Sequence, residues 1–178
     1  MTQKPADQTM QAAASQPADA ATAQVGGWLQ HLRLLVATLW VGSLWAIGYV
    51  AAPTLFASLS DRVLAGTIAG SLFRVEAWLS LACAAVLALL ILRLPATPGA
   101  SRAGSRRLLL KLIGAMALCT LVGYFGLQPF MAAIRETAAA TGGMQGDARL
   151  HFGLLHGAAS GIYLVQSLLG GWLMMRLR

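Results

Sequence analysis

Four long stretches without a lysine, arginine, aspartate or glutamate dominate this sequence. They cover residues 34–52, 77–92, 112–134 and 150–175. A charge in the middle of a bilayer costs several kcal/mol, and about 20 apolar residues are enough to cross the hydrocarbon core as a helix. We therefore predict an all-α integral membrane four-helix bundle. The predicted spans lie at about residues 30–53, 76–94, 108–128 and 151–174.

The composition agrees with a membrane protein. Of the 178 residues, 57% are hydrophobic and only 11% are charged, whereas about 25% are charged in an average soluble domain. The lipid bilayer is thus the expected partner. The formal net charge of +7 comes mainly from one loop and the C-terminus, so we expect no nucleic acid. Cys83 and Cys119 lie inside apolar runs and lack metal-site spacing, so neither a metal site nor any other cofactor is expected.

The basic residues predict the orientation. The connection after the second span carries no acid and holds Arg93, Arg102, Arg106, Arg107 and Lys111. In each of the other two connections the charges balance. Short loops rich in lysine and arginine stay in the cytoplasm. We therefore expect both termini and this basic connection on the cytoplasmic side.

Outside the spans, residues 1–26 are rich in alanine, glutamine, threonine and serine and are predicted to form a disordered cytoplasmic tail. Residues 27–178 form the membrane domain. No signal peptide is expected, because the first apolar run already has full span length. Residues 95–104 are predicted to be a flexible link between the second and third spans.

The connection after the first span has apolar side chains at helical spacing. We predict a short amphipathic helix over residues 60–73, lying on the outer membrane interface. Ser58 and Asp61 have the spacing of a capping box, and Pro53 is expected to end or kink the first span. Gly66 and Gly70 would let this helix pack closely on a neighbour.

Polar residues recur on one face of each span. The faces are Thr38, Gly42, Trp45 and Tyr49 on the first; Glu76, Ser80 and Cys83 on the second; Thr120, Tyr124 and Gln128 on the third; and His156, Ser160, Tyr163 and Ser167 on the fourth. Most of these fall in the predicted outer half. They predict a polar cavity lined by His156, Ser160, Tyr163, Tyr124, Gln128, Glu76 and Tyr49.

Two interpretations of this cavity stay open. In one, it binds or passes a small solute or ion, with His156 as the titratable group and Glu76 as its charge partner at the rim. In the other, the polar side chains form interhelical hydrogen bonds that fix the helix register.

A small-residue series lies beside the polar face of the fourth span. Gly153, Gly157 and Gly161 would let another helix approach closely. This favours an alternative function, that of a non-catalytic accessory or assembly subunit acting in a homo-oligomer or a larger membrane complex.

Enzymatic signatures are missing from the sequence. It contains no nucleophile elbow, phosphate loop or zinc-protease motif, so we expect no enzyme. A bis-histidine haem site is not expected, because His151 points about 140° away from His156 around the helix and His31 lies at the opposite surface. No carboxylate is expected in the bundle interior, which argues against a proton-coupled transporter.

Several short runs resemble a known family. They lie at 39–43 (LWVGS), 51–56 (AAPTLF), 61–66 (DRVLAG), 128–135 and 152–163. The pattern is similar to the bacterial domain-of-unknown-function 4149 membrane proteins, related to eukaryotic transmembrane protein 205. The resemblance implies four spans in a bacterial inner membrane and no known activity. Ser43 stands where a second glycine is common, and Glu76 where a histidine is expected.

Overall fold

The computed structural model describes residues 27–93, 100–140, 143 and 146–177. Four helices in this part are long and apolar enough to cross a membrane, and no strand is present among the described residues. The prediction of an all-α, four-span protein is confirmed. The predicted tail at 1–26 and most of the predicted link, residues 95–99, lie outside the described residues.

Each span is one helix or a series of helical segments without a break. In chain order they are residues 27–45 with η1 (Ala46–Ala51) and α2 (Ala52–Ser58); α3 (Arg62–Arg93); α4 (Ala100–Thr120) with η2 (Leu121–Leu127) and α5 (Gln128–Ala140); and α6 (Gly146–Leu177). The helices therefore extend beyond the predicted spans.

The separate interfacial helix is the main correction to the predicted fold. Residues 62–73 form the first turns of α3, which continues without interruption to Arg93. The stretch contains no proline, so nothing removes a hydrogen bond from the helical ladder. The Asp61 side chain begins the helix, because its Oδ1 accepts from the backbone N–H groups of Val63 at 2.8 Å and Leu64 at 3.1 Å. Asp61 is thus the cap itself, rather than the end of a box begun by Ser58.

Two π-helical segments interrupt the first and third spans at matching places. Pro53 lies two residues after η1, and Pro129 lies two residues after η2. A proline inside a helix has no N–H and clashes with the carbonyl four residues earlier. A local π turn relieves this problem in membrane helices. At η1, the Ala52 N–H bonds to the Ile47 carbonyl, five residues back. The predicted disturbance at Pro53 is therefore a π segment, and the helix continues to Ser58.

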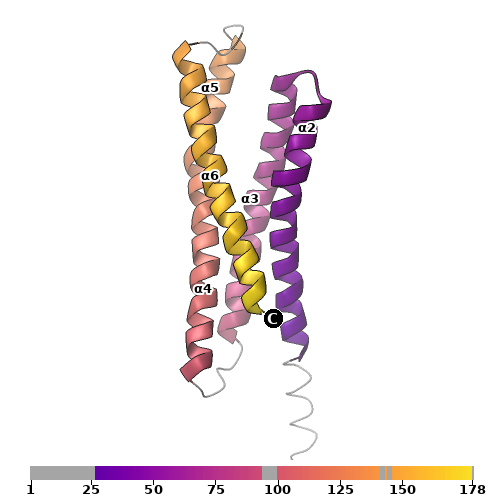
Figure 1. Cartoon of the computed structure of the whole chain (residues 1–178), viewed down its shortest axis with the longest axis vertical. Coiled ribbons are helices and arrows are strands. Elements are labelled where there is room, and N and C mark those ends of the chain that lie inside the picture. The colour runs from indigo at the N-terminus through magenta and orange to yellow at the C-terminus, as the bar shows by residue number, and fades with distance from the viewer. Residues whose placement is uncertain (1–26, 94–99, 141–142, 144–145, 178) are drawn as a thin grey trace, which may run out of the picture.

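The fourth span crosses the bundle at an angle (Figure 1). It begins beside α5, packs along α4, and ends near the first helix. Where it meets the first helix, a Cβ on Gly170 would lie 3.2 Å from Val41 and 3.3 Å from Met116. The apolar core is in this half, where α6 ends. Its large, fully buried apolar side chains are Trp40, Leu44, Leu87, Met116 and Leu173. Toward the other end, the pair α2 and α3 diverges from the pair α5 and α6.

Candidate functional site

A carboxylate lies in the interior of the bundle. Glu76 is only 3% exposed, and it stands near the middle of α3, fourteen residues after Arg62 and seventeen before Arg93. The sequence predicts Glu76 at the rim of a cavity and no carboxylate inside the bundle, and the second of these predictions is wrong. The reason is the length of α3, which begins well before the predicted start of the second span.

A chain of hydrogen bonds leads to Glu76. The Trp40 indole Nε1 donates to Ser80 Oγ at 2.8 Å, and Ser80 Oγ donates to Glu76 Oε1 at 3.0 Å. The Ser43 hydroxyl lies near the same carboxyl. The second carboxyl oxygen, Oε2, is buried and has no hydrogen-bond partner among the described residues.

The groups around Glu76 do not neutralise its charge. Trp40 and Ser80 are neutral donors, and none of the described lysine, arginine or histidine side chains forms an ion pair with the carboxylate. An isolated carboxylate in an apolar interior is very costly. Glu76 is therefore expected to carry a proton, or to bind a cation through the unpartnered Oε2.

Aromatic side chains surround the first-span π segment next to this carboxyl. The Tyr163 hydroxyl donates to the Leu44 carbonyl, and its ring makes edge-to-face contacts with Tyr49 and Phe73 at centroid distances of 6.2 and 5.5 Å. The ring lies directly on Gly48, where a Cβ would be 2.8 Å from both Cζ and Oη of Tyr163. A glycine at this position thus leaves the space that the Tyr163 ring fills between α6 and the first span.

Hydrogen bonds also join the third and fourth spans. Gln166 Nε2 donates to Thr120 Oγ1 at 3.0 Å, and Thr120 Oγ1 donates to the Met116 carbonyl at 3.2 Å. The neighbouring Ser167 hydroxyl is buried and unpartnered among the described residues. Gln166 and Thr120 therefore meet where α6 packs on α4. Thr120 belongs to the predicted polar face of the third span, and it is buried there.

The first two residues of the predicted α6 face lie on the exposed side of the helix. His156 and Ser160 are exposed, and the His156 ring stacks on Phe152 at 6.0 Å with an interplanar angle of 5°. Gly153, Gly157 and Gly161 are exposed too, and a Cβ on any of them would meet no other described side chain within 4 Å. No described helix of the chain packs there, so a close helix contact at these glycines stays a prediction.

Tyr124 and Gln128 lie on a different side of α3 from Glu76. Arg74 Nε donates to the Tyr124 hydroxyl at 3.2 Å, and Gln128 Nε2 lies 3.6 Å from where a Cβ on Gly70 would be. The seven predicted cavity residues are therefore divided among three places: the interior around Glu76, the α3–η2 contact, and the exposed face of α6.

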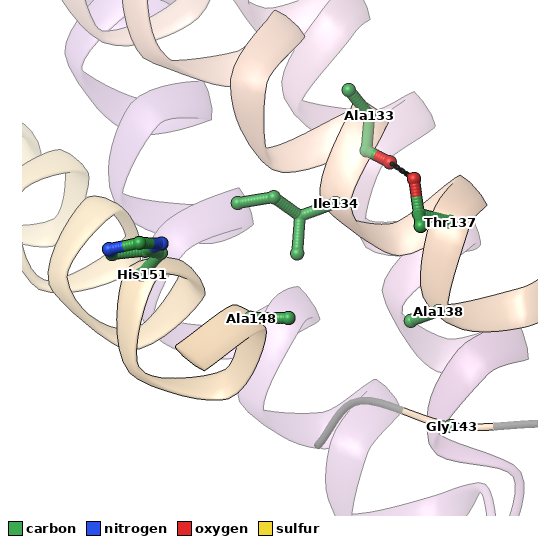
Figure 2. Close-up of a pocket in the computed structure, with 7 residues that line it drawn as sticks. All are labelled: Ala133, Ile134, Thr137, Ala138, Gly143, Ala148 and His151. Atoms are coloured by element: carbon green, nitrogen blue, oxygen red, sulfur yellow. Dashed lines mark hydrogen bonds between the residues drawn. The ribbon is translucent and has the colours of Figure 1, made fainter. Parts of the chain in front are cut away.

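A pocket of about 520 Å³ lies elsewhere, between α5 and the first turns of α6 (Figure 2). Its lining residues are Ala133, Ile134, Thr137, Ala138, Gly143, Ala148 and His151. The Thr137 hydroxyl donates to the Ala133 carbonyl at 3.0 Å. The lining is mostly small and apolar, and it includes none of the predicted cavity residues.

On the first span, the predicted polar face is the wrong one. Thr38, Gly42, Trp45 and Tyr49 are exposed, whereas the buried face consists of Ala37, Trp40, Val41 and Leu44. The signal that we missed is Trp40, since a buried indole N–H needs an acceptor. On the second span, Glu76, Ser80 and Cys83 are all buried, so that predicted face is confirmed.

A comparison of the sequence with known families gives a match, which covers most of the residues around Glu76. The family described as "Domain of unknown function (DUF4149)" matches residues 35–140. The chain belongs to this family. The DUF4149 match includes Trp40, Ser80 and Glu76 and ends before α6, so the resemblance noted at 152–163 lies outside it. No curated protein and no solved structure matches the chain.

Proposed function

We propose that this DUF4149 protein binds a proton or a small monovalent cation at Glu76 and passes it through the membrane bundle. The observation that carries the proposal is the buried Oε2 of Glu76, which has no partner among the described residues. An ionisable side chain inside a membrane bundle is a candidate for an ion or proton pathway because it is costly to keep there.

The surrounding side chains favour a small, singly charged ligand. Among the described residues, no group of three or more histidine, cysteine, aspartate or glutamate side chains could hold a metal ion. A divalent or transition metal is normally held by several such ligands. Glu76 offers one carboxylate with neutral hydroxyls beside it, which is sufficient for a proton or a monovalent cation.

The backbone near Glu76 supports a functional role as well. Both π segments contact α3, and Tyr163 packs against η1. Segments of π-helix occur often at functional sites.

The first experiment tests the chemical state of Glu76. A hydrophobic carbodiimide reacts with protonated carboxyls in membranes, and mass spectrometry of the intact protein counts the adducts. We expect labelling of wild type that falls as pH rises, and no labelling of Glu76→Gln. Glu136→Gln is the matched control, because Glu136 is an exposed carboxylate on α5. Protection by Na⁺, K⁺ or Li⁺ would identify a metal cation rather than a proton.

The second experiment tests passage. Proteoliposomes with a trapped pH-sensitive dye are exposed to a pH step or to a cation gradient. We expect wild type and Glu136→Gln to dissipate the gradient and Glu76→Gln to fail while keeping its helical content. If wild type is neither labelled nor able to dissipate any of these gradients, Glu76 is a structural hydrogen-bonding residue and the proposal is refuted.

The proposal includes a location and an orientation. The basic connection and C-terminal end support a cytoplasmic position for both termini, and the family resemblance to bacterial membrane proteins supports the inner membrane. The absence of hydrolase or phosphate-binding motifs from the sequence supports a role without catalysis. A relation to eukaryotic transmembrane protein 205 is part of the same proposal and rests on the short motifs alone.

A second candidate function is association through α6. Of the four spans this one has the lowest mean hydropathy, yet it has the smallest share of buried residues. Its exposed glycines suit close packing of a second copy of the chain. We expect Gly157→Leu to abolish dimers detected by crosslinking in membranes. Gly114→Leu is the control, because Gly114 is exposed on α4 with no described side chain near it. A wild-type protein that stays monomeric would exclude this function.

A further inference from the structure

A row of polar contacts joins α3 to η2 and α5 on the side of α3 away from Glu76. On α3, Gly66, Gly70 and Arg74 are spaced four residues apart and so share one side of the helix. Opposite them lie Arg135, Gln128 and Tyr124. We call these six residues the arginine seam.

The two glycines make room for the arginine of α5. Arg135 Nη1 donates to the Gly66 carbonyl at 3.2 Å, and it lies 3.8 Å from where a Cβ on Gly70 would be. Arg135 Nε donates to the Met131 carbonyl of its own helix at 3.3 Å. The close packing predicted for Gly66 and Gly70 is thus against side chains from α5.

The seam has unused donors. Arg74 donates through Nε to Tyr124, while its two terminal nitrogens, Nη1 and Nη2, have no partner among the described residues. Nη2 of Arg135 is likewise without one. Arg74 is an exposed side chain, and Nη2 of the half-buried Arg135 is not among the buried unpartnered atoms. These nitrogens are therefore accessible to a ligand.

No acid among the described residues balances the seam. Asp61 caps α3 through its side chain, Glu76 is buried on the other side of that helix, and Glu136 and Asp147 are exposed and form no ion pair with either arginine. The seam thus carries two positive charges. Arginine binds phosphate through paired N–H groups and is well suited to such a ligand.

An exposed aromatic pair continues the seam along α3. Trp78 is one turn after Arg74 and is 61% exposed, and Phe125 follows Tyr124 and is 42% exposed. Their rings contact edge to face, with centroids 5.6 Å apart. A cationic group next to exposed aromatic side chains matches the boundary between headgroups and acyl chains.

We propose that the arginine seam binds the phosphate of an anionic phospholipid, whose acyl chains lie over Trp78 and Phe125. The aromatic pair is the reason to favour a lipid over free phosphate, since a free anion makes no use of it. The proposal does not depend on the function of Glu76.

The test measures lipid preference. Full-length protein in detergent micelles is titrated with phosphatidylglycerol or phosphatidylcholine, and native mass spectrometry counts the bound lipids. We expect phosphatidylglycerol to bind wild type in preference to phosphatidylcholine. Arg74→Gln together with Arg135→Gln should weaken that binding about tenfold or more, because charge-assisted hydrogen bonds are lost. Arg62→Gln is the control, since Arg62 is an exposed arginine of the same helix outside the seam.

Two further measurements keep the proposal falsifiable if Arg135→Gln fails to fold. Arg74→Gln alone removes one charge without touching the Arg135–Gly66 bond. Phosphatidylglycerol with brominated acyl chains should quench the fluorescence of wild type more than that of Trp78→Phe. Equal binding of the two lipids, equal loss in Arg62→Gln, or full competition by inorganic phosphate would each overturn the proposal.

Discussion

The contact between Gly48 and Tyr163 gives the sharpest test of how the fourth span docks on the first. In Gly48→Ala, the added methyl would overlap Cε1 of the Tyr163 ring and lie 2.8 Å from its Cζ and Oη. Carbon atoms in ordinary contact are about 3.5–4.0 Å apart, so the ring has to move by more than about 1 Å. That movement also strains or breaks the hydrogen bond from Tyr163 to the Leu44 carbonyl.

The change in the free energy of unfolding combines two destabilising effects and one stabilising effect. Overpacking by one methyl costs about 1–3 kcal/mol, and an intramembrane hydrogen bond contributes about 0.6 kcal/mol on average. Alanine in a helix is more favourable than glycine by about 1 kcal/mol. The net change in Gly48→Ala is therefore small. The clash is better measured as a coupling energy with Tyr163→Ala, because the helix-propensity effect is the same in both backgrounds and cancels.

We expect Gly48→Ala to be stabilising, or neutral, once Tyr163 is alanine, and to be less favourable by about 1–3 kcal/mol when the tyrosine is present. Reversible unfolding in mixed micelles with rising SDS content, followed by fluorescence and circular dichroism, gives the four free energies. Gly42→Ala is the matched control, because Gly42 is in the same helix with no described side chain near a Cβ. A coupling energy near zero for Gly48, equal to that of Gly42, would refute the docking of Tyr163 on η1.

Three further predictions concern the ends and the contacts of the helices. Asp61→Ala should destabilise the start of α3 by about 1 kcal/mol, seen as faster hydrogen exchange at the amides of Val63 and Leu64, and unchanged exchange would exclude the cap. Thr120→Ala should destabilise the bundle by about 1 kcal/mol, because it leaves the buried Gln166 amide unpaired. Adding Gln166→Leu to Thr120→Ala should cause little further loss in SDS unfolding, whereas two additive losses would contradict the bond.

The number of long apolar helices could be predicted from the sequence, but the ends of those helices could not. Charged residues mark apolar runs reliably because a charge facing lipid is costly. The same criterion fails for a charge that faces protein, as at Glu76, or that reaches a neighbouring helix, as Arg74 reaches Tyr124. The α3 helix of 32 residues is about 48 Å long, well beyond the hydrocarbon thickness of about 30 Å. Composition alone gives no sign of where such a helix begins.

Helical periodicity predicted the site only where a helix packs along its whole length. On α3 the face of Glu76, Ser80 and Cys83 is buried as expected. On α6 a single face was drawn from His156 to Ser167, but the helix crosses the bundle at an angle, and only its second half is buried. A helical wheel describes direction around the axis and contains no information on where along the axis a neighbour lies.

The two sides of α3 explain why its charged residues do not neutralise each other. Arg74 and Glu76 are two residues apart, which separates their side chains by about 200° around the helix. Glu76 faces inward to hydroxyls and the Trp40 network, whereas Arg74 faces η2 and the exposed aromatic pair. An ion pair between them would have neutralised Glu76, and it would have removed the charge of Arg74 from the seam. Because the helix geometry forbids that pair, one span places an unpaired carboxyl group inside the bundle and an unpaired guanidinium group toward its surface.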